Sequence, residues 1–143
     1  MNRGSRTHCG CKTRELQSIQ KRKKYGESLK NRVIDYYKGN ARKRNLEFNL
    51  KNEEMIKLMD GNCYYCGIEP FNIMKHKNSY GEIKYNGIDR LDSSKGYIKG
   101  NVVSCCKRCN RMKNTYTEKE FLLIIKNIYE YSKLHNVNFN ILE

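Results

Sequence analysis

The sequence has few acidic residues, a single proline and no long apolar run. Its longest strongly apolar segment, residues 121–125, is far shorter than the roughly 20 residues that a membrane-spanning helix needs, which argues against membrane insertion. It also lacks an apolar stretch of the signal-peptide kind, which argues against secretion. We therefore expect a cytoplasmic protein whose thiols stay reduced, and we interpret the seven cysteines as metal ligands rather than as a disulfide framework.

Basic residues are concentrated in the first third of the chain. Residues 1–50 carry 14 lysines and arginines against 4 acidic residues, which accounts for ten of the fourteen net positive charges. Tyr25, Tyr36 and Tyr37 lie among the basic runs, as in proteins that contact a phosphate backbone. We predict a nucleic acid partner, with acidic proteins and anionic membrane surfaces as alternatives. The predicted contacts include a basic triplet, Arg42, Lys43 and Arg44.

Two cysteine pairs stand out by their spacing. Cys63 and Cys66 are separated by two residues, and Cys106 and Cys109 repeat this spacing about forty residues later. Two such knuckles can close a tetrahedral zinc site in which protein fills all four positions, and a chain of 143 residues with a modest core would gain stability from it. Cys105 could replace Cys106, but only Cys106 repeats the spacing of the first pair.

The remaining pattern predicts short elements around these knuckles. Apolar residues at spacings of three to four predict a helix over residues 28–44, and a second helix over 52–59 leads into the first knuckle. We interpret residues 68–82 as a loop, and residues 83–88 and 101–104 as two paired strands around a turn-rich connection. A third helix is expected to start at the second knuckle.

A last helix is predicted over residues 117–135. It opens with a capping box, in which Thr117 is the N-cap and Glu120 is the third helical residue. Apolar side chains recur along it at helical spacing, and we expect them to be buried in the core: Phe121, Leu122, Ile125, Ile128, Tyr129 and Leu134.

Three polar residues between the knuckles are expected to converge. Asp89 and Arg90 end the first predicted strand, and Asn110 lies near the start of the helix after the second knuckle. A carboxylate and an amide oxygen are hard ligands that suit Mg²⁺ or Mn²⁺, with coordination positions left for water and phosphate. The sequence therefore predicts a divalent metal site that binds a scissile phosphate.

These residues resemble a known family. The string Gly87-Ile-Asp-Arg-Leu-Asp-Ser-Ser-Lys-Gly-Tyr97, followed by Asn101-Val-Val-Ser-Cys-Cys-Lys-Arg-Cys-Asn-Arg-Met-Lys113, resembles phage-type HNH endonucleases, in the four-cysteine branch of the ββα-metal or His-Me finger superfamily. The likeness covers about residues 28–116. It implies an α+β fold, in which zinc staples a small ββα-metal core between flanking helices. It also implies metal-dependent hydrolysis of DNA phosphodiesters, of homing, nicking or restriction type, in the cytoplasm of a bacterial host cell. The resemblance is also compatible with a homodimer of this chain.

The resemblance further implies roles for single residues. Arg108 and Lys113 would contact phosphates, and Asn101 matches the asparagine that braces the loop through backbone hydrogen bonds. The matching metal ligands are Cys63, Cys66, Cys106 and Cys109 for zinc, and Asp89 and Asn110 for the catalytic Mg²⁺ or Mn²⁺.

One position departs from the family pattern. The general-base histidine that normally follows the aspartate is replaced by Arg90, which cannot accept a proton from water but can bind a phosphate. A variant branch that includes rare-cutting restriction enzymes has the same Asp-Arg pair, and there a tyrosine inside the first knuckle is thought to initiate cleavage. Tyr65 matches that tyrosine, with Arg90 available to stabilise its phenolate. His76 and water activated without a protein base are the alternatives.

Two domain-level expectations complete the analysis. Residues 1–26 should form a basic arm, and residues 27–143 the nuclease domain with a basic N-terminal helix and a C-terminal helix. Within the arm, Gly4-Ser-Arg-Thr-His-Cys-Gly-Cys11 resembles the closing half of a four-cysteine zinc module, whose opening pair would precede residue 1. The rival function is a non-catalytic, zinc-dependent DNA- or RNA-binding protein.

Overall fold

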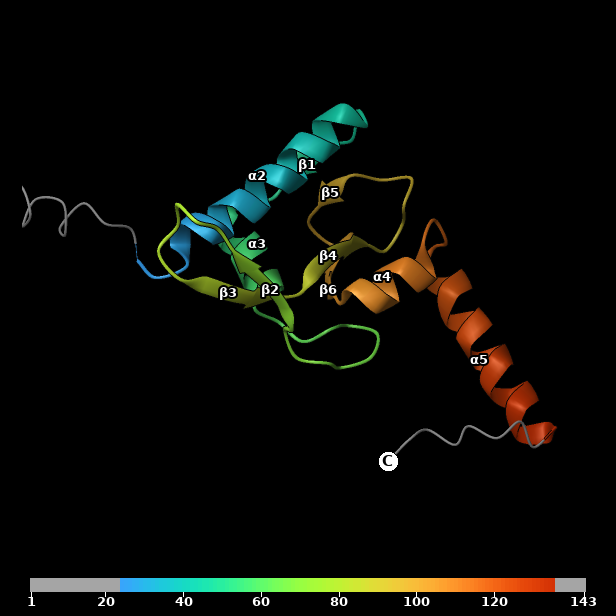
Figure 1. Ribbon diagram of the computed structural model, residues 1–143. Helices are drawn as coiled ribbons and strands as arrows, with labels where there is room; N and C mark the ends of the chain where they lie inside the picture. The colour runs from blue at the N-terminus through green and yellow to red at the C-terminus, as the bar shows by residue number, and fades with distance from the viewer. Residues whose placement is uncertain (1–23, 136–143) are drawn as a thin grey trace, which may run out of the picture.

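The computed structural model describes residues 24–135, so the predictions for the arm before residue 24 lie outside the described residues. Two helices with a short strand between them come first, five short strands follow, and two further helices end the described chain (Figure 1). No helix of the described residues is long and apolar enough to cross a membrane. In chain order the elements are α2 (Glu27–Lys43), β1 (Phe48–Asn49), α3 (Asn52–Met59), β2 (Asn72–Lys75), β3 (Glu82–Tyr85), β4 (Gly87–Arg90), β5 (Tyr97–Ile98), β6 (Val102–Cys105), α4 (Lys107–Lys113) and α5 (Glu118–Leu134).

The centre of the molecule is an antiparallel pair of strands followed by a helix. β4 pairs with β6, with Asp89 opposite Val103 and Arg90 opposite Val102. The chain then enters α4, which packs beside β4 (Figure 1). This α+β arrangement of two strands and one helix is the ββα core that the sequence predicted, and it places the end of β4 against α4.

The core lies mainly under α2. Leu29, Val33, Ile34 and Ala41 form the buried face of this helix. They pack against α3 and against β3 and β4, and the complete buried cluster also contains Met55, Met59, Ile83, Ile88 and Tyr97. The predicted helices over residues 28–44 and 52–59 are confirmed within one residue at each end. A basic helix that buries one apolar face leaves its opposite face to solvent, where charged side chains stay hydrated.

The strand prediction was wrong in two places. Residues 68–82, expected to be a loop, contain β2, which forms an antiparallel hairpin with β3. The expected strand over 83–88 is two strands, because Asn86 leaves the ladder. Its backbone amide donates to the Met59 carbonyl at 2.9 Å, and its side-chain amide donates to the carbonyls of Gly61 and Ile68 at 3.0 and 3.2 Å. Asn86 thus anchors the segment that holds the first knuckle.

Helix α5 begins as predicted but is not buried as predicted. The Thr117 hydroxyl accepts from the Glu120 amide at 3.3 Å, and the Glu120 carboxylate accepts from the Thr117 amide at 2.7 Å. Of its side chains only Phe121 and Ser132 are buried, whereas Leu134 is 78% exposed. Figure 1 shows α5 extending away from the rest of the described chain. The expected stripe therefore lies on the surface beyond Phe121, at Leu122, Ile125, Ile128, Tyr129 and Leu134.

Candidate functional site

The four predicted cysteines form one cluster. The Sγ atoms of Cys63, Cys66, Cys106 and Cys109 all lie within 4.8 Å of one another, and those of Cys66 and Cys106 are 3.8 Å apart. Zinc–thiolate bonds of about 2.3 Å in a tetrahedron separate the sulfurs by about 3.8 Å, so the cluster fits a zinc ion. Cys105 lies outside the cluster, since its thiol donates to the Cys106 carbonyl. The cluster contains Cys106, the residue that repeats the spacing of the first pair, and not Cys105.

Backbone contacts position the first knuckle. The Gly67 amide donates to the Cys63 carbonyl at 2.8 Å, and Gly67 has a φ of 73°, which a glycine adopts without strain. The Tyr64 amide donates to the Ser104 carbonyl of β6 at 2.8 Å, which ties the knuckle to the central strands. Burial raises the pKa of the Cys63 thiol, but backbone amides that donate to its sulfur outweigh this effect and lower the pKa to about 6.

The second knuckle is also the start of a helix. Cys106 is the N-cap of α4, and its Sγ accepts from the Cys109 amide at 3.4 Å. The same side chain therefore belongs to the thiolate cluster and fixes the first turn of α4. Because Asn110 lies in that turn, the cysteine cluster sets its position relative to β4.

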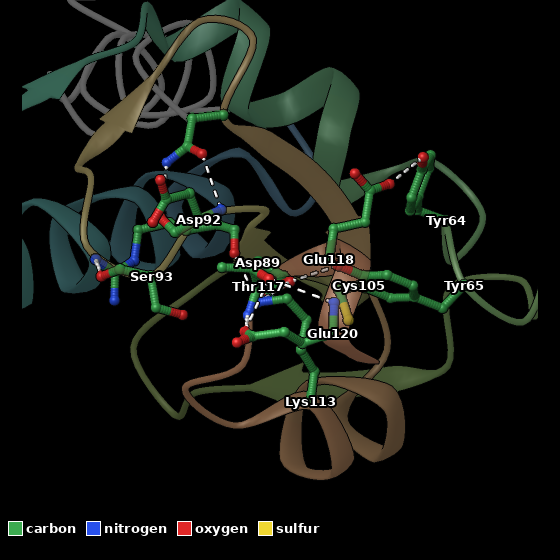
Figure 2. A network of polar contacts seen from close by, with 12 residues as sticks. Tyr64, Tyr65, Asp89, Asp92, Ser93, Cys105, Lys113, Thr117, Glu118 and Glu120 are labelled. Carbon is green, nitrogen blue, oxygen red and sulfur yellow. Dashed lines mark hydrogen bonds and ion pairs between the residues drawn. The ribbon is translucent and has the colours of Figure 1, made fainter. Parts of the chain in front are cut away.

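Asp89 lies at the centre of a small polar network (Figure 2). It is 6% exposed, and its Oδ2 accepts from the Tyr65 hydroxyl at 2.9 Å. The Lys113 ammonium lies 3.2 Å from Oδ2 and 3.5 Å from Oδ1, and it donates to the Arg90 carbonyl at 2.8 Å. Figure 2 shows Tyr65 and Lys113 approaching Asp89 from different directions. These two contacts fix the orientation of the carboxylate.

The position of Lys113 requires a correction. The sequence predicted a phosphate contact, but the Lys113 side chain is fully buried. Its ammonium is already bound to Asp89 and to a backbone carbonyl, so it has no path to a phosphate in this conformation. Helical spacing placed it one turn beyond Asn110 but could not show which way the side chain turned.

Asp89 and Asn110 meet in one cleft. The cleft has a volume of about 670 Å³, and β4 contributes Asp89 and Arg90 to it. The other described residues that line it are Tyr36, Tyr37 and Asn40 from α2, Arg44 at the C-cap of α2, Ile88 from β4, Lys107, Asn110 and Arg111 from α4, Ser93 and Tyr97 between the central strands, and Asn114 and Thr115 after α4. An acid and an amide therefore share a cavity with four cationic side chains, which suits a metal bound together with an anionic ligand.

Arg90 is held by the loop between β4 and β6. Its guanidinium donates to the carbonyls of Ser93 and Lys95 at 2.8 and 2.7 Å and lies 5.4 Å from the centre of the Tyr97 ring. These contacts point it toward the loop, whereas the sequence led us to expect it beside the phenol of Tyr65. The guanidinium still lines the cleft, so its remaining N–H donors can reach an anion there.

Asn101 braces the same loop. Its side-chain amide donates to the carbonyls of Asp92 and Gly96 at 3.1 and 2.9 Å, and its carbonyl oxygen accepts from the Asp92 amide at 3.0 Å. These are the kind of contacts that the resemblance implied for this residue. With Asn101 on one side and Arg90 on the other, the loop is held at five hydrogen bonds.

The two candidate bases lie in different places. Tyr65 is half-buried at Asp89, with its ring 5.2 Å from that of Phe121. Burial and the charge of Asp89 raise its pKa, so the phenol is a hydrogen-bond donor in this state. His76 lies in the turn between β2 and β3, in a separate hollow beside Asn31 and Asp35 of α2. Neither Tyr65 nor His76 is among the residues that line the cleft around Asp89, but Tyr65 contacts Asp89 directly.

The predicted basic contacts point in different directions. Arg44 lines the cleft, whereas Arg42 lines another hollow with Lys38 and Phe48. Lys43 and Arg108 are exposed, and they line neither the cleft nor this second hollow. Sequence analysis missed Asn40, Lys107 and Arg111 as cleft residues. The spacing of Tyr36, Asn40 and Arg44 by four residues on a predicted helix was a signal that could have found one wall.

Comparison with known proteins supports the fold. The structure is similar to that of the rare-cutting HNH restriction endonuclease PacI, with a TM-score of 0.52 and 21% sequence identity over 75% of this chain and 81% of that chain. At this identity the likeness shows a shared fold. No family model matches the chain.

Two curated relatives are viral. The chain is 34% identical over 137 residues to the uncharacterized protein R423 of Acanthamoeba polyphaga mimivirus, which covers 89% of this chain and 24% of that protein. It is 30% identical over 92 residues to an uncharacterized 29.0 kDa protein encoded in the dda-modA intergenic region of Enterobacteria phage T4, covering 64% of this chain and 34% of that protein. The chain thus spans about a quarter to a third of the length of these relatives.

Proposed function

We propose that the chain is an HNH-type endonuclease domain that hydrolyses DNA phosphodiester bonds with the aid of a divalent metal ion. The observation that carries this proposal is the convergence of Asp89 and Asn110 in a cleft that also contains Arg44, Lys107 and Arg111. The fold shared with PacI and the fit of the cysteine cluster to zinc support it. The viral relatives favour a role in a phage or mobile element, of homing, nicking or restriction type.

Asp89 and Asn110 are the residues that would hold Mg²⁺ or Mn²⁺. Their oxygens are hard donors, and both residues line the cleft, so a cation between them would be open to a phosphate. When bound, such an ion supplies Lewis-acid stabilisation of the charge that develops on the phosphoryl oxygens. The protein's own contribution begins with Tyr65 and Lys113, which hold the Asp89 carboxylate in place from the interior.

The cations of the cleft would orient the nucleic acid. Arg44 at the end of α2 and Lys107 and Arg111 on α4 all line the cleft, so a phosphate backbone that enters it meets positive charge from two separate elements. Arg90, fixed by its two bonds to the loop, has donors left for a phosphate oxygen at the floor. Exposed Tyr36 adds an aromatic side chain at the rim.

For the base or nucleophile we propose Tyr65 rather than His76. Neither side chain lines the cleft, but the Tyr65 hydroxyl donates directly to Asp89, which does line it, whereas His76 lies in the hollow beside the first turns of α2. We expect Tyr65→Phe to abolish cleavage while zinc content, folding and DNA affinity are kept, because only the hydroxyl is lost. His76→Ala should cleave like the wild type. Wild-type cleavage by Tyr65→Phe would remove this hydroxyl from the chemistry.

The test of function is a nicking assay. Supercoiled plasmid is incubated with the zinc-loaded protein and Mg²⁺ or Mn²⁺, and the open-circular and linear products are separated on a gel. Asp89→Asn keeps the size of the side chain and should lose the activity, whereas Asp60→Asn, at a surface ion pair with Lys30, should keep it. If the protein binds DNA but cleaves it neither with Mg²⁺ nor with Mn²⁺, the result would instead support the alternative function, a non-catalytic zinc-dependent DNA- or RNA-binding protein.

A further inference from the structure

Lys113 is the largest fully buried side chain of the described residues, and it is charged. A buried ammonium is costly unless it is paired, and Lys113 has such partners in Asp89 and the Arg90 carbonyl. Asp89 lines the cleft, whereas Lys113 does not. The ammonium therefore contacts the carboxylate from outside the cleft, whereas Asp89 itself lines it.

The charges around the cleft have a consequence for metal binding. Lys113 balances the single negative charge of Asp89, and Asn110 and Tyr65 are neutral ligands or neighbours. Arg44, Arg90, Lys107 and Arg111 add further positive charge to the cleft. Affinity of oxygen sites for divalent cations rises with the number of anionic ligands. The site in the free protein offers a divalent cation no net negative charge.

We propose that Lys113 makes divalent-metal binding depend on nucleic acid: the free protein binds the ion weakly, and a bound phosphodiester supplies the negative charge that Lys113 cancels. This inference rests on the proposed function, because it assigns the same cleft to the same metal and substrate. Lys113 is a positioning residue in this scheme, since it acts through Asp89. By linkage, the metal must strengthen DNA binding by the same factor as DNA strengthens metal binding.

The first experiment measures metal binding without cleavage. Mn²⁺ is titrated into zinc-loaded protein, so that the cysteine cluster is filled, and free Mn²⁺ is followed by electron paramagnetic resonance. The titration is repeated with a short DNA duplex, and Asp89→Asn, alone and with the duplex, supplies the background of Mn²⁺ bound elsewhere. We expect the duplex to tighten Asp89-dependent Mn²⁺ binding at least tenfold. Equal Mn²⁺ affinity with and without the duplex would overturn the proposal.

The second experiment tests Lys113 itself. Lys113→Met removes the ammonium and keeps an unbranched apolar chain, so the Asp89 charge becomes available to the ion. We expect the Mn²⁺ affinity of the free variant to rise about tenfold and the further gain from the duplex to shrink. Lys30→Met, at the surface pair with Asp60, is the matched control and should change neither value. Unchanged or weaker Mn²⁺ binding in folded Lys113→Met would refute the role of Lys113.

The two proposals can fail separately. All of these measurements report binding, so they do not depend on turnover. If the duplex tightens Mn²⁺ binding but plasmid is never cleaved, the catalytic proposal fails and the coupling stands. If plasmid is cleaved but Mn²⁺ binds the free protein as tightly as the complex, the coupling fails and the catalytic proposal stands. Should Lys113→Met not fold, the comparison of wild-type protein with and without DNA still decides whether metal binding depends on nucleic acid, and equal Mn²⁺ affinities there overturn the proposal.

Discussion

The hydroxyl of Tyr37 offers a sharp test of how α2 is joined to the site. It accepts a hydrogen bond from the Ile88 amide at 2.8 Å, and Ile88 is 2% exposed and directly precedes Asp89. Tyr37→Phe removes one oxygen atom and leaves this buried N–H without a partner. An unsatisfied buried donor costs about 1–3 kcal/mol. A cost of about 2 kcal/mol, the middle of this range, combined with a midpoint shift of roughly 3–6 °C per kcal/mol for a domain of this size, predicts that Tm falls by about 6–12 °C.

The neighbouring tyrosine provides the control. Tyr36 is 68% exposed, so Tyr36→Phe should change the free energy of unfolding by no more than about 0.5 kcal/mol. Urea unfolding of both zinc-loaded variants at pH 7, followed by circular dichroism, gives the difference directly. If Tyr37→Phe unfolds at the same urea concentration as Tyr36→Phe, the hydrogen bond to Ile88 does not hold β4 and the reasoning is refuted.

The pH dependence gives a second check on Tyr37. Burial raises the pKa of this phenol in the folded state, whereas the unfolded state has the ordinary value of about 10. The folded protein therefore keeps a proton that the unfolded chain releases at high pH. Stability from this group is complete below about pH 10 and is lost as the pH rises further. Phenylalanine has no such proton, so the gap between wild type and Tyr37→Phe should narrow above pH 10.

Three further predictions concern the metal, the nucleic acid and the loop. Cys106→Ser should lose bound zinc and the cooperative unfolding transition, whereas Cys105→Ser should keep one zinc per chain, as measured by elemental analysis. Loss of zinc in both variants would contradict a zinc site made of the four clustered cysteines. Arg44→Ala should lower the slope of log affinity against log salt by about 0.9 in DNA-binding titrations, and Arg42→Ala, on another face of α2, should leave it unchanged; equal slopes would place the DNA elsewhere. Asn101→Ala removes three hydrogen bonds to the loop. It should lower the free energy of unfolding, measured in urea, by about 2–4 kcal/mol. A loss under about 1 kcal/mol would show that the loop is held by Arg90 alone.

Features set by local spacing were predictable from the sequence. Two cysteines separated by two residues are close in space because they are close in sequence. Matching the spacing of the two pairs therefore selected Cys106, which lies in the cluster, over Cys105, which does not. The capping box at Thr117 and Glu120 is also local, since its two hydrogen bonds join residues three apart. The placement of Asp89 and Asn110 in one cleft followed from the order of strand, loop, strand and helix between the knuckles.

Features set by distant partners were not predictable. The sequence of β2 does not alternate between polar and apolar residues, since Ile73 and Met74 are adjacent and Ile73 is 59% exposed. Its pairing with β3 makes it a strand. Periodicity showed that α5 has apolar side chains at helical spacing, but it could not show that no other described element covers Leu122 or Ile128. The burial of Lys113 depends on a carboxylate 24 positions earlier, and no pattern on its own helix indicates that partner.

The double role of Cys106 also orders events during synthesis. The first knuckle is complete once Cys66 has been made, but the partners that close the cluster follow up to 43 positions later. At translation rates of about 5–20 residues per second this interval lasts roughly 2–9 s. The N-cap of α4, Cys106, is made near the end of this interval, and Asn110 directly follows Cys109, so α4 can form only after the interval has ended. A growing chain therefore carries Asp89 before the residues that form the opposing part of the cleft exist, and the cysteine cluster is complete just before Asn110 is added.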